Sequence, residues 1–258
     1  MRNAELTPAE QALAAAVPRG QEVDLSTAGS GRSVRAEVLA GLLLGEYADP
    51  ADKPALRLTG ARITGLLHLA FGEIDFPVTF RRCAFDEAPD LYQARTRFLS
   101  FDGSELPGLV ASNLQVEGNL RLTGCHVTGE LRLPGARING TLTMNGARLD
   151  HPGGAAVNAE RLDVGGDLRA HDGFACDGEL ILTAARVGAA LNLDGARLRA
   201  PAGWRSAART WSSRWACSPG TWRWTARSTC VSPGSAGRSR CAARACATPA
   251  AWPCTAAG

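Results

Sequence analysis

The sequence predicts an all-β repeat protein, in which a β-solenoid over residues 55–203 follows a small α-helical cap at residues 1–54. Three observations predict this fold class. Apolar residues recur with a period of 11 through most of residues 56–198. Inside each unit, apolar and polar residues alternate over short stretches, which is typical of strands. Glycines every five or six residues indicate turns and would interrupt any helix within two turns.

The first segment, residues 1–54, is predicted to form the cap. Thr7-Pro8-Ala9-Glu10 fits a capping box with proline at the first helical position, which predicts a helix at about 8–17. Ser33 is a candidate cap for a second helix at about 33–46, and Asp49-Pro50 would end it. We expect the two helices to cover the open edge of the first coil, which would otherwise invite strand addition.

The repeat itself begins at Leu56. Residues 56–65 read L-x-L-x-G-A-x-I-x-G, and one spare residue completes the unit of 11. Strands this short are stable only when stacked coils bury one continuous interior. A coil of two such units would have four short faces, and a coil of three units is the alternative. Small residues are expected to share one inward slot: Ala61, Cys83, Cys125, Ala136 and Ala147.

These units resemble a known family. Leu56–Gly60 and Ala61–Gly65 look like two pentapeptide repeats, A-[DN]-[LF]-x-x, except that arginine replaces the usual Asp or Asn. The T-P-A-E start and the R-A-E-V-L helix at Arg35–Leu39 are similar to long actinobacterial-type proteins labelled "membrane-associated oxidoreductase". The resemblance covers residues 4 to about 203 and implies a right-handed quadrilateral β-solenoid. The label implies an oxidoreductase activity, for which the sequence shows no residues.

The tail, residues 204–258, has a different composition. It holds all six Trp, five of the eight Cys and no Asp or Glu; it carries +8, so that the remaining residues carry −5 of the total +3. Such a segment cannot build a conventional core and would be disordered. We interpret it as an out-of-frame translation beginning near 200–203. Trp and Cys codons begin with TG, so in the frame that starts at the third base of each codon every Trp and Cys gives an NTG codon, which encodes Leu, Val or Met. Several of the aliphatic residues restored in this way are 11 apart. A genuine basic tail is the alternative.

Catalytic and cofactor motifs are absent from the sequence. No 18-residue apolar run and no secretory signal occur, so we expect a cytoplasmic protein. No Rossmann fingerprint, P-loop or G-x-S-x-G is present, and we predict no cofactor. There is no C-x-x-C and no zinc-ligand spacing among the four His, so buried thiols and surface imidazoles are the favoured interpretation.

One extended surface pattern remains, a ladder of arginines. Six arginines share the position after the small slot: Arg62, Arg95, Arg137, Arg148, Arg186 and Arg197. Stacked coils would place them on one face, about 4.8 Å apart where adjacent, where they could face phosphate groups. Glu73 and His126 interrupt the ladder, so a mixed, solvated face is the favoured interpretation.

The sequence therefore predicts only a broad class of function. The first hypothesis is a non-enzymatic scaffold or protein-interaction module with an unknown protein partner. The alternatives are an oxidoreductase, as the family label suggests, and a peripheral binder of anionic membrane surfaces that uses the arginine ladder. We expect self-association through an uncapped C-terminal coil near Arg197. Residues 1–203 carry a net charge of −5, so we predict no specific nucleic-acid partner.

Overall fold

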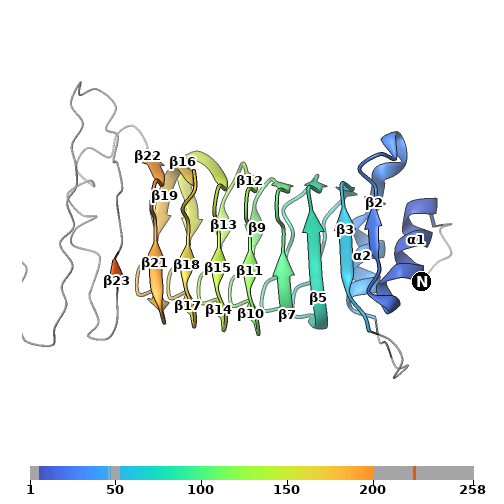
Figure 1. Ribbon diagram of the computed structural model, residues 1–258, viewed down its shortest axis with the longest axis horizontal. Helices are drawn as coiled ribbons and strands as arrows, with labels where there is room; N and C mark the ends of the chain where they lie inside the picture. Colours follow the sequence, from blue (N-terminus) through green and yellow to red (C-terminus); the bar gives the residue numbers. More distant parts are fainter. Residues whose placement is uncertain (1–5, 46, 48–52, 200–222, 225–258) are drawn as a thin grey trace, which may run out of the picture.

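The protein is a stack of parallel coils, which confirms the predicted β-solenoid (Figure 1). The computed structural model describes residues 6–45, 47, 53–199 and 223–224. Helices α1 (Pro8–Ala16) and α2 (Ala36–Leu43) lie at the N-terminal end of the stack. The predictions for residues 204–258 lie outside the described residues, apart from the two-residue strand β23 (Arg223–Trp224), which pairs with β21.

The cap begins as predicted. Thr7 Oγ1 accepts a hydrogen bond from the Glu10 amide at 3.3 Å, and the Thr7 amide donates to Glu10 Oε2 at 2.9 Å, so the capping box is complete. A short 3₁₀ helix, η1 (Val17–Arg19), follows α1, and Gly20 ends it in the left-handed conformation, at φ 62°. A second 3₁₀ helix, η2, spans Gly29–Arg32.

The prediction that Ser33 caps the second helix is wrong. Ser33 opens a strand, β2 (Ser33–Arg35), which pairs with β4 (Arg62–Thr64). Helix α2 starts only at Ala36, because the preceding residues are drawn into the sheet of the first coil. Strand β1 (Glu22–Asp24) pairs with β3 in the same way, so the cap is joined to the solenoid by backbone hydrogen bonds as well as by packing.

Each coil passes through four faces. The first face comprises β3 (Leu56–Thr59), the ends of β5 (Glu73–Arg81) and β7 (Arg95–Ser100), β11 (Leu120–Arg121), β15 (Leu142–Thr143), β18 (Leu168–Arg169) and β21 (Ala190–Asn192). The second comprises β2, β4, β6 (Ala84–Phe85), β8 (Glu105–Leu106), β12 (His126–Val127), the starts of β16 (Arg148–Asn158) and β19 (Ala175–Ile181), and β22 (Arg197–Arg199). The third comprises β9 (Leu109–Val110), β13 (Leu131–Arg132) and the ends of β16 and β19. The fourth comprises the starts of β5 and β7, β10 (Gln115–Val116), β14 (Arg137–Ile138), β17 (Asp163–Val164) and β20 (Arg186–Val187).

The register shows that one coil holds two sequence units. Leu56 pairs with Val78, which occupies the same position two units later, so the two-unit coil is confirmed over the three-unit alternative. One coil is longer, because Leu142 pairs with Leu168 instead of with the residue exactly two units on. The extra residues lie in β16, where the register with β19 shifts between Asp150 and Ala155.

Turns in the left-handed conformation separate the faces at two opposite corners. Gly60, Gly103 and Gly124 have φ of 71°, 69° and 64° at one corner, where glycine adopts this conformation without strain. At the opposite corner the equivalent position holds Gly135 at φ 66° but also residues with side chains, among them Gln93 and Asn113, at φ 54° and 56°. The recurring glycines thus mark turns, as predicted.

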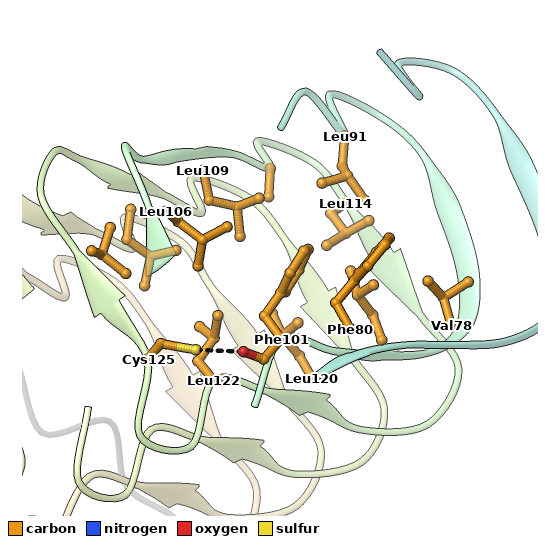
Figure 2. Packing of buried hydrophobic residues seen from close by; sticks show 14 of the residues in the cluster. Val78, Phe80, Leu91, Phe101, Leu106, Leu109, Leu114, Leu120, Leu122 and Cys125 are labelled. Carbon is orange, nitrogen blue, oxygen red and sulfur yellow. Dashed lines mark hydrogen bonds between the residues drawn. The ribbon is translucent and has the colours of Figure 1, made fainter. Parts of the chain in front are cut away.

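Inside the coils, apolar side chains form one continuous core. Phe80 and Phe101 are fully buried and stack with ring centroids 5.5 Å apart, as Figure 2 shows. In the same region the thiol of Cys125 donates to the Phe101 carbonyl oxygen at 2.9 Å (Figure 2). Because side chains from neighbouring coils interlock, the outer faces are held on a rigid support.

Candidate functional site

The six candidate arginines do not form one ladder, so that prediction is wrong. Arg62, Arg148 and Arg197 lie on the second face, whereas Arg95, Arg137 and Arg186 lie on the fourth. The reason is the coil length: two 11-residue units complete one coil, so equivalent positions of successive units fall on opposite faces. The five small residues predicted to share one inward slot are also divided between two columns. Ala136 lies on the side of the coil opposite the column of Ala61, Cys83, Cys125 and Ala147.

Both arginine columns carry mixed charge. Arg62 Nε lies 2.8 Å from Asp86 Oδ1, and Arg95 NH1 lies 3.2 Å from Glu73 Oε1 on the neighbouring coil. Asp150 Oδ2 accepts from Arg148 Nε at 2.6 Å and lies 3.0 Å from His126 Nε2. Desolvation of half-buried Asp150 acts to raise the pKa of its carboxyl, but these contacts together hold that pKa below the usual value. Positive charge is therefore spread over two faces and locally offset.

The three described cysteines are buried and free. Burial raises the pKa of the Cys83 thiol to about 11 and that of Cys125 and Cys176 to about 12, because the thiolate would lose its hydration. These thiols therefore lack the thiolate character that nucleophiles and metal ligands need. Within the described residues, no three His, Cys, Asp or Glu side chains gather closely enough to hold a metal ion.

A polar groove of about 400 Å³ on the first face is the strongest candidate site. Its central column follows the register Arg57, Thr79, Ser100 and Arg121 over four adjacent coils. Thr79 is half-buried and Ser100 is buried, with 1% of its surface exposed, so the floor between the two exposed arginines is low and only Thr79 is open to solvent. The groove exists because outward positions on the first face alternate with the buried leucines of the same strands.

Side walls close the groove along both edges. Pro77 and Phe98 are register partners on one edge and provide an apolar wall. Arg81 and Asp102 line the other edge, two residues beyond Thr79 and Ser100 along the chain. Each wall therefore comes from the same two coils as the floor, and the lining is positioned by the parallel pairing of β5 and β7.

Hydrogen bonds fix the acidic groups of this groove, henceforth the first-face groove. Asp102 Oδ2 accepts from Arg121 Nε at 2.9 Å and NH2 at 2.7 Å, and Asp102 Oδ1 accepts from the Thr123 amide at 3.1 Å. At the cap end, Glu22 Oε1 accepts from Thr59 Oγ1 at 2.9 Å and lies 3.9 Å from Arg81 NH1. Both carboxylates are engaged, while Arg57 has no ion pair within the described part of the chain.

Sequence reasoning missed this groove. Its signal is two arginines separated by two short hydroxyl residues at coil spacing, Arg57, Thr79, Ser100 and Arg121. That signal becomes visible only when the number of units in a coil is known. The 11-residue period alone would place residues from two opposite faces in one column, whereas the true column takes one residue from every second unit.

Neither membrane-spanning helices nor known proteins point to a function for this chain. No helix among the described residues has both the length and the apolar character needed to cross a membrane. The chain matches no family model, no curated protein and no solved structure.

Proposed function

We propose that the chain is a non-enzymatic β-solenoid scaffold that binds a protein partner through its outer faces. One observation supports this proposal above others: outward side chains of stacked coils lie in register and form an extended polar surface, hollowed at the first-face groove. Repeat folds commonly use such extended surfaces for binding.

The rigidity of the support favours this role. Arg57 lies between the fully buried Leu56 and Leu58, and Thr79 lies between the buried Val78 and Phe80. The core therefore fixes the backbone of both outward residues. A partner that docks on such a face immobilises side chains but need not order the backbone, which reduces the entropic cost of association.

A peripheral membrane binder fits these faces less well. Attraction to an anionic surface sums over the cations that approach it together, at about 1 kcal/mol for each. The six arginines are divided between two opposite faces, and Asp86, Glu73 and Asp150 pair with three of them. A flat membrane would therefore meet a mixed surface on either side. The oxidoreductase alternative is tested separately below.

The test uses the full chain and two matched variants. Thr79→Trp fills the first-face groove, whereas Thr143→Trp places the same side chain in the same column outside it. A protein captured from cell extract is purified and its affinity for each variant is measured by calorimetry. We expect saturable binding that Thr79→Trp weakens and Thr143→Trp preserves. Absence of any partner that binds again after purification would count against the proposal.

A parallel titration addresses the oxidoreductase alternative. NAD(P)H, FAD and FMN are added to the full chain, and binding is followed by their fluorescence. The scaffold proposal expects no saturable binding. Stoichiometric binding of any of these cofactors would favour an enzyme in its place.

A further inference from the structure

Resting on the proposed function, we infer that the first-face groove binds an oxyanion, a phosphate ester or a carboxylate, carried on an extended segment of the partner. The segment would lie along the stack between Arg57 and Arg121. Four features of the groove support this inference: an uncommitted guanidinium, a hydroxyl floor, a fixed second guanidinium and an apolar wall.

The uncommitted guanidinium belongs to Arg57. Its register partner on the cap is Glu22, but the Glu22 carboxylate accepts from Thr59 Oγ1 and forms its ion pair with Arg81. Arg57 is exposed and has no ion pair within the described residues. Guanidinium groups present several donors in one plane, which match the paired oxygens of carboxylate and phosphate.

The floor supplies a hydroxyl donor. Ser100 is buried, with 1% of its surface exposed, and its Oγ accepts a hydrogen bond from the Asp102 amide at 3.3 Å, so Ser100 supports the floor from beneath. Thr79, the register partner of Ser100 on the neighbouring coil, is half-buried and provides the hydroxyl that a ligand can reach. Because Thr79 is short, an oxyanion can approach its hydroxyl between the longer arginines.

Arg121 differs from Arg57 because it is already oriented. Asp102 accepts from both Nε and NH2 of Arg121, which fixes the plane of this guanidinium at the far end of the floor. Asp102 therefore positions Arg121 and also offsets part of its charge. With three arginines against two carboxylates, the lining remains positive, although residues 1–203 as a whole are negative. A local field of this sign favours anionic ligands.

The dimensions indicate an extended ligand. Arg57 and Arg121 are three register steps apart, roughly 14 Å at about 4.8 Å for each step. That length corresponds to about four residues of extended peptide. Pro77 and Phe98 line the whole of the intervening edge, so the ligand backbone or its apolar side chains would contact this wall.

The experiment uses the full chain and immobilised short alanine-glycine peptides whose two central positions are phosphoserine, glutamate or serine. Biolayer interferometry gives the affinity at low and moderate salt. We expect binding of the phosphoserine peptide, the glutamate peptide or both, weakening with salt, and no binding of the serine peptide. The stronger anionic peptide identifies the source of the oxyanion.

Variants test the residues. Arg57→Ala should weaken binding about tenfold, as expected for a lost charge-assisted hydrogen bond at an exposed site. Arg137→Ala is the matched control, because Arg137 is exposed on the fourth face and has no ion pair within the described residues. Arg137→Ala should leave the affinity unchanged. Circular dichroism confirms that each variant is folded.

Two results would overturn the inference: equal binding of all three peptides, or equal affinities of the Arg57→Ala and Arg137→Ala variants. The outcome is separable from that of the proposed function. A purified protein partner that is sensitive to Thr79→Trp but not to Arg57→Ala would leave the scaffold standing and remove the oxyanion. Binding of the anionic peptides without any protein partner would support the oxyanion site and count against the scaffold proposal.

Discussion

Glu10 is the buried charge on which we expect the N-terminal cap to depend. Its side chain is fully buried and accepts hydrogen bonds from the Arg35 amide at 3.0 Å, Arg35 Nε at 2.9 Å and Arg35 NH2 at 2.7 Å. The Thr7 amide adds another at 2.9 Å. These bonds join α1 to β2 and the start of α2, so one carboxylate connects the helical cap to the first coil.

The magnitude follows from the pKa of this carboxyl. Hydrogen bonds from Arg35 outweigh the cost of burial and lower the Glu10 pKa from 4.5 to about 2. A difference of that size corresponds to about 3 kcal/mol. The Arg35 side chain is 31% exposed, so solvent screening reduces the contribution, and we expect about 2 kcal/mol. Glu10→Gln should lower the stability of the cap by about this amount at neutral pH.

The pH dependence has a defined sign. A carboxyl whose pKa is lowered by folding contributes stability that is complete above its unfolded value of about 4.5. That stability is lost as pH falls from about 4.5 toward 2. The wild-type cap should therefore weaken across this interval, whereas the Glu10→Gln cap should show a smaller slope.

Hydrogen exchange is the assay, because local opening of a cap need not coincide with global unfolding of a repeat protein. The Gln11 amide donates to the Thr7 carbonyl in α1 and reports directly on the cap. Glu37→Gln is the matched control, since Glu37 meets Arg35 at 3.4 Å with 76% of its side chain exposed. Equal slopes for the wild type and Glu10→Gln between pH 4.5 and 2.5 would refute this reasoning.

Four further predictions follow from the fold and the sequence. Gly124→Ala should cost about 1 kcal/mol in urea unfolding because Gly124 has φ 64°, whereas Gly153→Ala, with open space around its Cβ position, should be neutral. Cys83, Cys125 and Cys176 should resist alkylation at pH 8 in the folded protein, measured by peptide mapping, because their thiol pKa values are raised to between about 11 and about 12. Sequencing the gene beyond codon 200 should show that the frame offset by two bases restores the 11-residue repeat, with L-x-L-x-G-A-R-L over the codons of residues 238–246; a stop codon in that frame or absence of the repeat contradicts the frameshift hypothesis. Size-exclusion chromatography should show self-association, and a clean monomer would count against this prediction.

Local signals made the fold accessible from the sequence. The 11-residue period predicts short stacked strands, and the capping box at Thr7 and Glu10 predicts α1, because both depend on neighbouring residues. Ser33 shows the opposite case. Its neighbours suit a helix, but pairing with Arg62, which is distant along the chain, holds it in a strand, and this non-local gain is invisible to local propensity.

The candidate site depends on closure of the coil, which a linear period does not determine. An 11-residue repeat places Arg62 and Arg137 at equivalent positions, but the two-unit coil places them on opposite faces. The same closure brings Arg57 and Arg121 into one column with two short residues between them. Candidate sites on a solenoid are therefore found along columns, and columns are defined only after the number of units in a coil is known.

Different residues should therefore determine the stability of this protein and its binding of ligands. Buried positions such as Leu56 and Leu99 hold adjacent coils together, so substitutions there open a cavity in the core. Outward positions such as Arg57 touch solvent and make no ion pair within the described residues, so their substitution should leave unfolding unchanged while altering the groove. Arg57→Ala that lost both peptide binding and thermal stability would mean that Arg57 supports the fold, and the assignment of the groove would fail with it.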